Sequence, residues 1–395
     1  MQLPFPVSFS ACTRAQTPLA VAAWALIAAG AAGLAGCATT GTAEGGAIVS
    51  AKERNARFTP ATEAYSTLGY RHTWTGFPTM TAGARVSSLD VFEDVVTVVE
   101  SGGVLSVLEA ASGQTRWSDQ LGNPLTKFLG VTRDDKQIIC TTETDAYFLD
   151  IDTGTLVGKD RLLKVGNTPP EQVGNVLVYA TAGGEIFGQV KLAGFRSWGH
   201  SMPGNISVRP GRMGNTLGFV SSTGDVLFLD GATGTGFGRA KMFMGTDVPP
   251  ATSEELMFVA SRDQSLYAFS AASSAPVWRY RTNVVLHDRP VYNAGVVYCS
   301  INGQGLTAFS EFGDGGRGNV LWTAAEVKGY VVGMRGGRLL VWDGSDACLL
   351  DPASGDLIER VALPGVTKVT TDGFVDGNLY MSTPEGLVIK LQPRL

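Results

Sequence analysis

The sequence predicts an all-β fold, an eight-bladed β-propeller of four-stranded blades in which an N-terminal strand completes the last blade. Three observations predict this fold: an excess of glycine, a repeat of about forty residues, and an incomplete copy at each end of the repeat array. Glycine supplies 50 of the 395 residues, well above its usual share of about 7%. Because glycine favours tight turns, this excess indicates many short strands rather than long helices.

The repeat consists of an apolar strand, a small polar turn, a second apolar strand, and a Ser/Thr-Gly type of turn before a further short strand. A phase marker, often tryptophan, stands four residues after that turn. The markers are Trp74, Trp117, Gly158, Trp198, Gly238, Trp278, Trp322 and Glu359. Successive markers lie 37 to 44 residues apart, a step that fits one propeller blade. We therefore expect eight blades, with the tryptophans packed between neighbouring blades.

Polar residues at the repeated turn are predicted to shape the backbone. Its glycine is expected at positive φ, which other residues adopt at a cost. Asp150, Asp230 and Asp351 precede such turns, and an aspartate in this place accepts hydrogen bonds from backbone N–H groups. We interpret these three carboxylates as turn formers and not as ligands.

The two ends of the repeat array are predicted to pair with each other. The last copy stops at Leu395 before its tryptophan-bearing strand, whereas residues 69–76 form an isolated strand of that kind around Trp74. Pairing the two would complete the eighth blade and remove two exposed strand edges.

The N-terminal segment is predicted to be a targeting signal. Residues 18–35 contain no charged side chain, and the apolar run closes on Leu34, Ala35, Gly36 and Cys37. This pattern is similar to the lipobox of bacterial lipoproteins. The resemblance implies a signal peptide over residues 1–36 and acyl chains on Cys37, where two or more chains give durable anchoring. The alternative is an uncleaved anchor helix with an incidental cysteine.

The remaining chain divides into a tether and one domain. Residues 37–68 are interpreted as the lipidated cysteine and a flexible tether, and residues 69–395 as the propeller. Ala38 rather than aspartate follows the cysteine, which resembles lipoproteins that are sorted to an outer membrane.

Composition argues against several classes of function. The formal charge is −5 and only three histidines occur, so neither a nucleic-acid partner nor a multi-histidine metal centre is expected. Cys140, Cys299 and Cys348 are widely spaced and two of them lie in apolar runs. They are predicted to be buried free thiols rather than a disulfide framework.

One sequence pattern carries a family resemblance. The spacing L-x-A-x-x-G-x-x-x-W, seen from Leu108 to Trp117 and loosely from Phe269 to Trp278, is similar to the PQQ-type propeller repeat. Together with the lipobox it resembles the BamB family of outer-membrane assembly lipoproteins. The resemblance implies a non-enzymatic, lipid-anchored scaffold on the periplasmic side of the outer membrane, without a cofactor. It also implies a monomer that works within a complex, with a BamA-like barrel-assembly protein and unfolded outer-membrane proteins as partners.

Two other hypotheses about the function stay open. Quinoprotein dehydrogenases share the repeat, but they resemble one another in a vicinal Cys-Cys pair beside the quinone, and this sequence contains no such pair. A degenerate dehydrogenase is therefore the weaker reading, and no catalytic or cofactor-binding residue is predicted. The other reading is a lipid-anchored propeller that binds another envelope protein, a polysaccharide or a solute.

An interaction surface is predicted where arginine and aromatic residues are densest. Such residues are enriched at protein interfaces, although arginine on a propeller loop is often merely solvated. A glycine-rich insertion at residues 311–319 also breaks the period. The candidates are Arg279, Tyr280, Arg281, His287, Arg289, Phe312 and Arg317.

Overall fold

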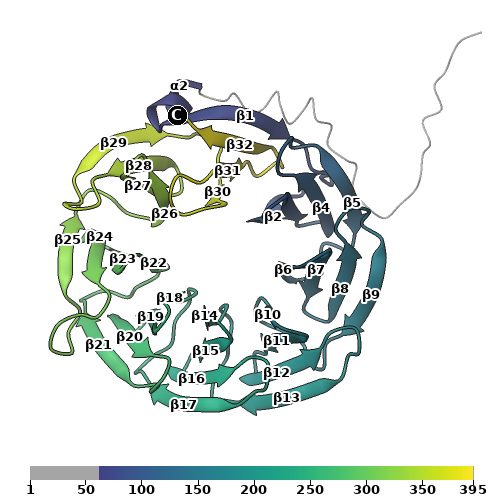
Figure 1. Ribbon diagram of the computed structural model, residues 1–395, viewed down its shortest axis with the longest axis horizontal. Helices are drawn as coiled ribbons and strands as arrows, with labels where there is room; N and C mark the ends of the chain where they lie inside the picture. Colours follow the sequence, from purple (N-terminus) through teal and green to yellow (C-terminus); the bar gives the residue numbers. More distant parts are fainter. Residues whose placement is uncertain (1–61, 395) are drawn as a thin grey trace, which may run out of the picture. The chain divides into compact units, whose positions relative to one another are not determined.

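The computed structural model describes residues 62–394, which form eight four-stranded antiparallel sheets and one short helix. The sheets follow one another around a ring, each with one strand near the centre and one at the rim (Figure 1). The expected eight-bladed propeller is confirmed. Among residues 62–394, no helix has the length and apolar character needed to cross a membrane.

Each of blades 1 to 4 consists of four consecutive strands, which run in order from the centre of the ring to its rim. These are β2 (Val86–Val91), β3 (Val95–Glu100), β4 (Val104–Glu109) and β5 (Thr115–Gln120) in blade 1; β6 (Phe128–Asp134), β7 (Gln137–Thr142), β8 (Asp145–Asp150) and β9 (Leu156–Arg161) in blade 2; β10 (Glu171–Val173), β11 (Val176–Ala180), β12 (Glu185–Val190) and β13 (Arg196–Ser201) in blade 3; and β14 (Gly211–Met213), β15 (Thr216–Val220), β16 (Asp225–Asp230) and β17 (Gly236–Lys241) in blade 4.

Blades 5 to 7 repeat this order, whereas blade 8 takes its outer strand from the start of the propeller. The strands are β18 (Ala251–Thr252), β19 (Leu256–Ser261), β20 (Ser265–Ser270) and β21 (Pro276–Arg281) in blade 5; β22 (Val291–Asn293), β23 (Val296–Ile301), β24 (Gly305–Ser310) and β25 (Val320–Ala324) in blade 6; β26 (Tyr330–Arg335), β27 (Arg338–Trp342), β28 (Asp346–Leu350) and β29 (Leu357–Ala362) in blade 7; and β30 (Lys368–Thr371), β31 (Leu379–Ser382), β32 (Val388–Pro393) and β1 (Tyr70–Gly76) in blade 8.

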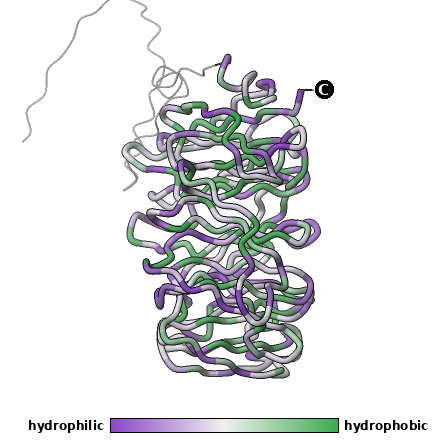
Figure 2. The backbone as a smooth tube through the Cα atoms, turned by 90° about the vertical axis from the view of Figure 1, so that its left-hand side faces the viewer, coloured by the Kyte–Doolittle hydropathy of each residue, from purple (hydrophilic) through white to green (hydrophobic). Residues whose placement is uncertain are grey.

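The two middle strands of each blade are the most apolar because neighbouring blades cover both of their faces. All six residues of β3 are buried, and so are all six of β19. Outer strands have one face toward solvent, and in β29 only one of six residues is buried. Figure 2 shows hydrophobic residues at every level of the ring, as expected when the core is a series of packed interfaces between blades.

Ring closure by the two chain ends is confirmed. β1 pairs antiparallel with β32, from Tyr70 opposite Pro393 to Gly76 opposite Val388. Arg335, at the end of β26 in blade 7, reinforces this closure. Its Nε donates to the Gly69 carbonyl oxygen at 2.8 Å, its Nη1 pairs with Asp376 at 2.7 Å, and its Nη2 donates to the Arg394 carbonyl oxygen. One guanidinium group therefore binds both ends of the described chain.

The tether ends earlier than the sequence predicts. Residues Thr62–Thr67 form helix α2 rather than a flexible segment, with Tyr65 only 2% exposed. Leu68, which follows the helix, is fully buried. Six residues are too few to show a helical period, and so short a helix depends on the blades it packs against. The described part of the propeller unit therefore starts at residue 62, and the lipobox with Cys37 lies outside the described residues.

The tryptophan markers pack between blades, as expected, and each lies against a glycine of the next blade. The pairs are Trp74 with Gly113, Trp117 with Gly154, Trp198 with Gly234, Trp278 with Gly313, and Trp322 with Gly355. These glycines have φ between 67° and 77°. A Cβ on Gly154 would lie 2.6 Å from the Trp117 ring. Glycine is required there for its backbone conformation and for the space it leaves.

Hydrogen bonds from the indole Nε1 fix the orientation of most of these tryptophan side chains. The indole Nε1 donates to a carbonyl oxygen of the next blade at 3.0 Å from Trp74, 2.9 Å from Trp117 and 2.6 Å from Trp278. The Nε1 of Trp198 is buried without such a partner in the described chain. The tryptophan that marks the repeat therefore contacts the neighbouring blade as well as its own.

Blades 2 and 4 have glycine in place of the marker tryptophan. In each of them a side chain from a turn of the following blade lies over that glycine. The Leu192 side chain lies over Gly158, and Ser274 lies over Gly238. Both Leu192 and Ser274 adopt positive φ, at 60° and 59°. The large side chain thus comes from the turn at the boundary between blades 2 and 3, whereas both partners are small at the boundary between blades 4 and 5.

Polar turns and buried thiols also follow the prediction. Asp150 accepts hydrogen bonds from the backbone N–H groups of Asp152 and Thr153 at 3.1 and 2.8 Å. Hydrogen bonding from Thr153 holds the pKa of the Asp150 carboxyl below its usual value. Asp230 and Asp351 accept equivalent backbone bonds. The three cysteines of the described region are buried and free.

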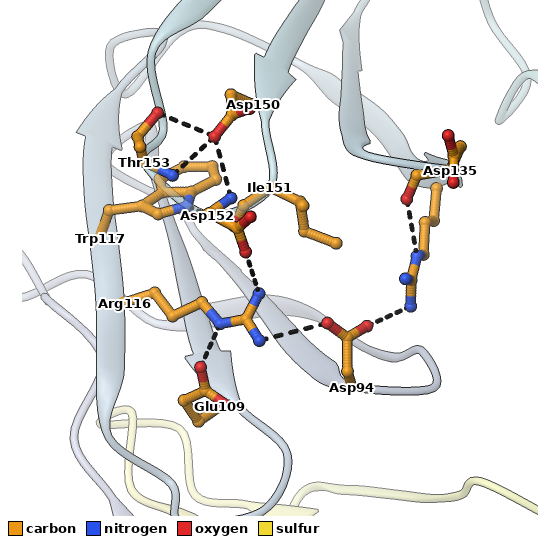
Figure 3. A network of polar contacts seen from close by, with 10 residues as sticks. Asp94, Glu109, Arg116, Trp117, Asp135, Asp150, Ile151, Asp152 and Thr153 are labelled. Atoms are coloured by element: carbon orange, nitrogen blue, oxygen red, sulfur yellow. Dashed lines mark hydrogen bonds and ion pairs between the residues drawn. The ribbon is translucent and has the colours of Figure 1, made fainter.

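An ion network joins blades 1 and 2 beside one of the tryptophan contacts. Arg116 in β5 points toward Asp94, Glu109 and Asp152 (Figure 3), and it pairs with Asp94 at 3.2 Å and with Asp152 at 3.1 Å. Arg133 of blade 2 also pairs with Asp94. These acidic side chains therefore bind arginines of the fold.

Candidate functional site

The seven predicted interface residues fall in two separate places. Arg279, Tyr280 and Arg281 lie on β21, the outer strand of blade 5, beside the insertion that carries Phe312 and Arg317. The other two are His287 and Arg289, which lie in the loop that leads from β21 to the inner strand β22.

The insertion extends the sheet of blade 5. The backbone N–H of Arg279 donates to the Gly316 carbonyl oxygen at 3.2 Å, and the N–H of Gly318 donates to the Arg279 carbonyl oxygen at 3.3 Å. The glycine-rich segment thus covers part of the outer edge of β21. Its sequence suits this because glycine allows close approach of two backbones.

Two side chains around the insertion, those of Arg279 and Tyr280, make contacts within the protein. The Arg279 Nε donates to the Ser265 hydroxyl at 2.9 Å, and its guanidinium lies 5.0 Å from the Tyr267 ring centre. Tyr280 packs edge-on against Phe309 at 4.8 Å between ring centres. Arg281 and Arg317 are exposed, and Phe312 is 56% exposed. Among the predicted interface residues beside the insertion, these last three have the side chains that are most exposed to a partner.

A second exposed surface was not predicted from the sequence. Loops that join the outer strand of one blade to the inner strand of the next all emerge on the same face of the ring, because every blade repeats one antiparallel order. Five large apolar side chains are exposed on three of these loops. They are Leu125, Leu163, Val165, Phe243 and Met244, and we call them the loop face. Leu125 is 91% exposed and Phe243 is 82% exposed.

The loop face could have been found from one signal in the sequence. Loops between strands are usually polar, whereas the segment from Met242 to Met244 is apolar and lies outside the strands of the repeat. Met242 is buried, and its neighbour Phe243 points into solvent. Aromatic residues and methionine are also the types enriched at protein interfaces.

A cavity of about 610 Å³, which we call the central cavity, lies on the inner side of four neighbouring blades. Its walls come from β2 of blade 1, from the starts of β26 and β30, from the turn after β27, and from the loop before β22. Charged residues of both signs line it. They are Asp90, Asp288, Arg289, Asp343 and Lys368.

The three buried thiols are not activated as nucleophiles. Burial raises the pKa of the Cys299 thiol to about 12 and that of Cys348 to about 11. It raises the pKa of the Cys140 thiol as well. A nucleophilic cysteine needs the opposite shift. Within residues 62–394, no group of three or more His, Cys, Asp or Glu is arranged to hold a metal ion.

Known structures share the fold at low sequence identity. The crystal structure of BamB from Moraxella catarrhalis is 20% identical, with a TM-score of 0.62, over 78% of this chain and 96% of that one. The crystal structure of the computationally designed Ika8 protein is 12% identical, with a TM-score of 0.65, over 82% of this chain and 99% of that one. None of the curated proteins compared with this sequence matches it.

A family model describes most of the propeller. The model for the outer membrane protein assembly factor BamB matches residues 100–234 and 222–392. The two matches overlap and together extend over blades 2 to 7 completely, with parts of blades 1 and 8. The chain therefore belongs to the family of the outer membrane protein assembly factor BamB.

Proposed function

We propose that this protein is a non-enzymatic scaffold lipoprotein that assists the assembly of β-barrel proteins in the outer membrane. The observation that carries the proposal is the family match over residues 100–392. The raised thiol pKa values and the engagement of acidic side chains in turns and ion pairs support a binding role rather than catalysis.

The loop face is the surface that best fits a protein partner. The loop face exposes Phe243 and Met244, and aromatic residues and methionine are enriched at protein interfaces. The expected partner is a BamA-like barrel-assembly protein, bound through its periplasmic domains. Unfolded barrel precursors would add strands to the free edges of the outer strands. At β21 the insertion blocks that mode, because it occupies the edge.

Co-purification tests the partner. The tagged protein, isolated from cross-linked and detergent-solubilised membranes, should bring a BamA-like barrel protein with it. The double variant Leu125→Ser and Phe243→Ser should recover at least about tenfold less of that partner, since losing two anchors costs about 1.4 kcal/mol or more. The matched control replaces Leu357 and Ile358 by serine on β29, where both are exposed, and should leave recovery unchanged. Absence of a BamA-like protein from the wild-type sample would contradict the proposal.

Lipid anchoring at Cys37 is tested separately. Cys37→Ala should abolish labelling of the protein by radioactive fatty acid, because the thiol is the attachment point in the lipobox pattern. Cys12→Ala is the matched control, and its labelling should match that of the wild type. Normal cleavage and labelling of Cys37→Ala would show that the protein is not anchored through this residue.

A further inference from the structure

Some of the charged groups in the central cavity form no ion pair with the rest of the described fold. It is bounded by residues of blades 6, 7, 8 and 1, whose inner strands face the middle of the ring in Figure 1. With a volume of about 610 Å³, it lies within the range of about 300–1,000 Å³ that is common for small-molecule sites. Because four blades contribute to it, the cavity exists only in the closed ring.

The two cations of the cavity have no acidic partner among residues 62–394. The Lys368 ammonium group makes neither an ion pair nor a hydrogen bond within that region, although the residue is half-buried. The Arg289 guanidinium lies over the Tyr330 ring at 4.0 Å from its centre and forms no ion pair there. Cations that the fold leaves unpaired in a concave site are available to an anionic group of a ligand.

Asp343, in contrast, is committed to the fold. Its Oδ1 accepts hydrogen bonds from the backbone N–H groups of Ser345 and Asp346 at 2.9 and 2.7 Å. Its Oδ2 pairs with Arg360 at 3.5 Å. This carboxylate holds a turn, so it is not counted among the groups available to a ligand.

Asp90 carries a buried carboxylate oxygen that lacks a partner. The residue lies on β2, and its Oδ2 is buried with no hydrogen-bond partner within the described chain. Burial raises the pKa of Asp90, and a hydrogen bond from the Ser88 side chain and the charges of Arg209 and Lys368 oppose that rise. Lys368 is therefore close enough to act on Asp90 electrostatically, but their charged atoms are not within 4.0 Å. A buried carboxylate oxygen without a partner is costly, and a cation bound at this carboxylate would offset that cost.

We propose that the central cavity binds a short peptide through its free termini. The peptide's ammonium group lies at Asp90 and its carboxylate at Lys368 and Arg289, so that the ligand bridges two opposite charges that do not touch each other. The hydroxyl group of Thr370, which also lines the cavity, provides a hydrogen bond for the peptide backbone. A peptide fits better than an acidic sugar because the site presents a carboxylate without an ion-pair partner as well as cations without one. The proposal goes beyond the scaffold function and does not rest on it.

Binding of trialanine with blocked and free termini tests the site. The full-length protein in detergent is titrated calorimetrically with trialanine, its N-acetyl form and its C-terminal amide. We expect free trialanine to bind at least about tenfold more tightly than either blocked form, the effect of losing one charged contact in a partly buried site. Asp90→Asn should remove the preference for the free ammonium group, and Lys368→Gln the preference for the free carboxylate.

The control variant is Lys164→Gln, which removes an exposed lysine outside the cavity and should bind like the wild type. Each variant is first shown to unfold at the wild-type urea concentration, so that lost binding is not lost folding. Equal affinity for free and blocked trialanine, no binding at millimolar concentration, or tighter binding of glucuronate than of trialanine would each overturn the proposal. A failure here leaves co-purification of the barrel-assembly partner unaffected, because the loop face lies on other residues.

Discussion

A protein that lacks residues 62–76 is expected to lose most of its free energy of unfolding, measured by urea denaturation. The deletion removes β1 and with it the whole ladder that closes the ring at β32. It also removes the buried side chains of Tyr65, Leu68 and Trp74. Loss of one buried aromatic side chain costs about 3–5 kcal/mol, whereas a folded domain is stable by only about 5–15 kcal/mol. The summed loss is therefore comparable to the total stability.

Two further variants separate ring closure from the mere shortening of the chain. Deleting residues 38–61 should leave the urea midpoint unchanged, because the sequence predicts no repeat strand there. Arg335→Met should lower the free energy of unfolding by about 1–3 kcal/mol, since the carbonyl oxygens of Gly69 and Arg394 lose a charged donor. If the 62–76 deletion unfolds like the parent, β1 does not close the ring.

The second large effect is expected from Gly154→Ala. The new Cβ would lie 2.6 Å from the Trp117 ring, and φ at Gly154 is 71°. Overpacking costs about 1–3 kcal/mol and the strained backbone adds about 1–3 kcal/mol. The free energy of unfolding should therefore fall by about 2–6 kcal/mol.

Gly174→Ala is the matched control for backbone strain. Gly174 also has a positive φ, at 58°, but a Cβ there would meet nothing within 4 Å. The difference in free energy of unfolding between the two variants measures the cost of crowding Trp117, without the cost of backbone strain. In a Trp117→Gly background, Gly154→Ala should lower the free energy of unfolding by less than it does in the wild-type protein, because the ring that crowds the new Cβ is gone. Equal destabilisation by Gly154→Ala and Gly174→Ala would show that the tryptophan contact does not require glycine.

Part of the candidate surface could be anticipated and part could not. The density of arginine and aromatic residues pointed to Arg281, Phe312 and Arg317, which the structure leaves exposed beside blade 5. The same criterion included Tyr280, which packs against Phe309. Composition cannot tell which face of a strand a side chain occupies. The loop face was missed because its residues come from three different loops, and only the stacking of blades places them on one side.

By itself, the sequence determined the number of blades, the positions of their turns and the way the ring closes. These features are local and repeated: the spacing of Trp117 and its equivalents counts the blades, and the missing strand before Leu395 requires the strand at Trp74. Only the tertiary structure decided where α2 packs, which glycine each tryptophan contacts, and how Asp90, Arg289 and Lys368 come to line one cavity. Residues 90 and 368 are far apart along the chain, and they become neighbours only because closure sets blade 8 beside blade 1. A repeat pattern specifies what each blade is, whereas the contacts between blades depend on the geometry of the whole ring.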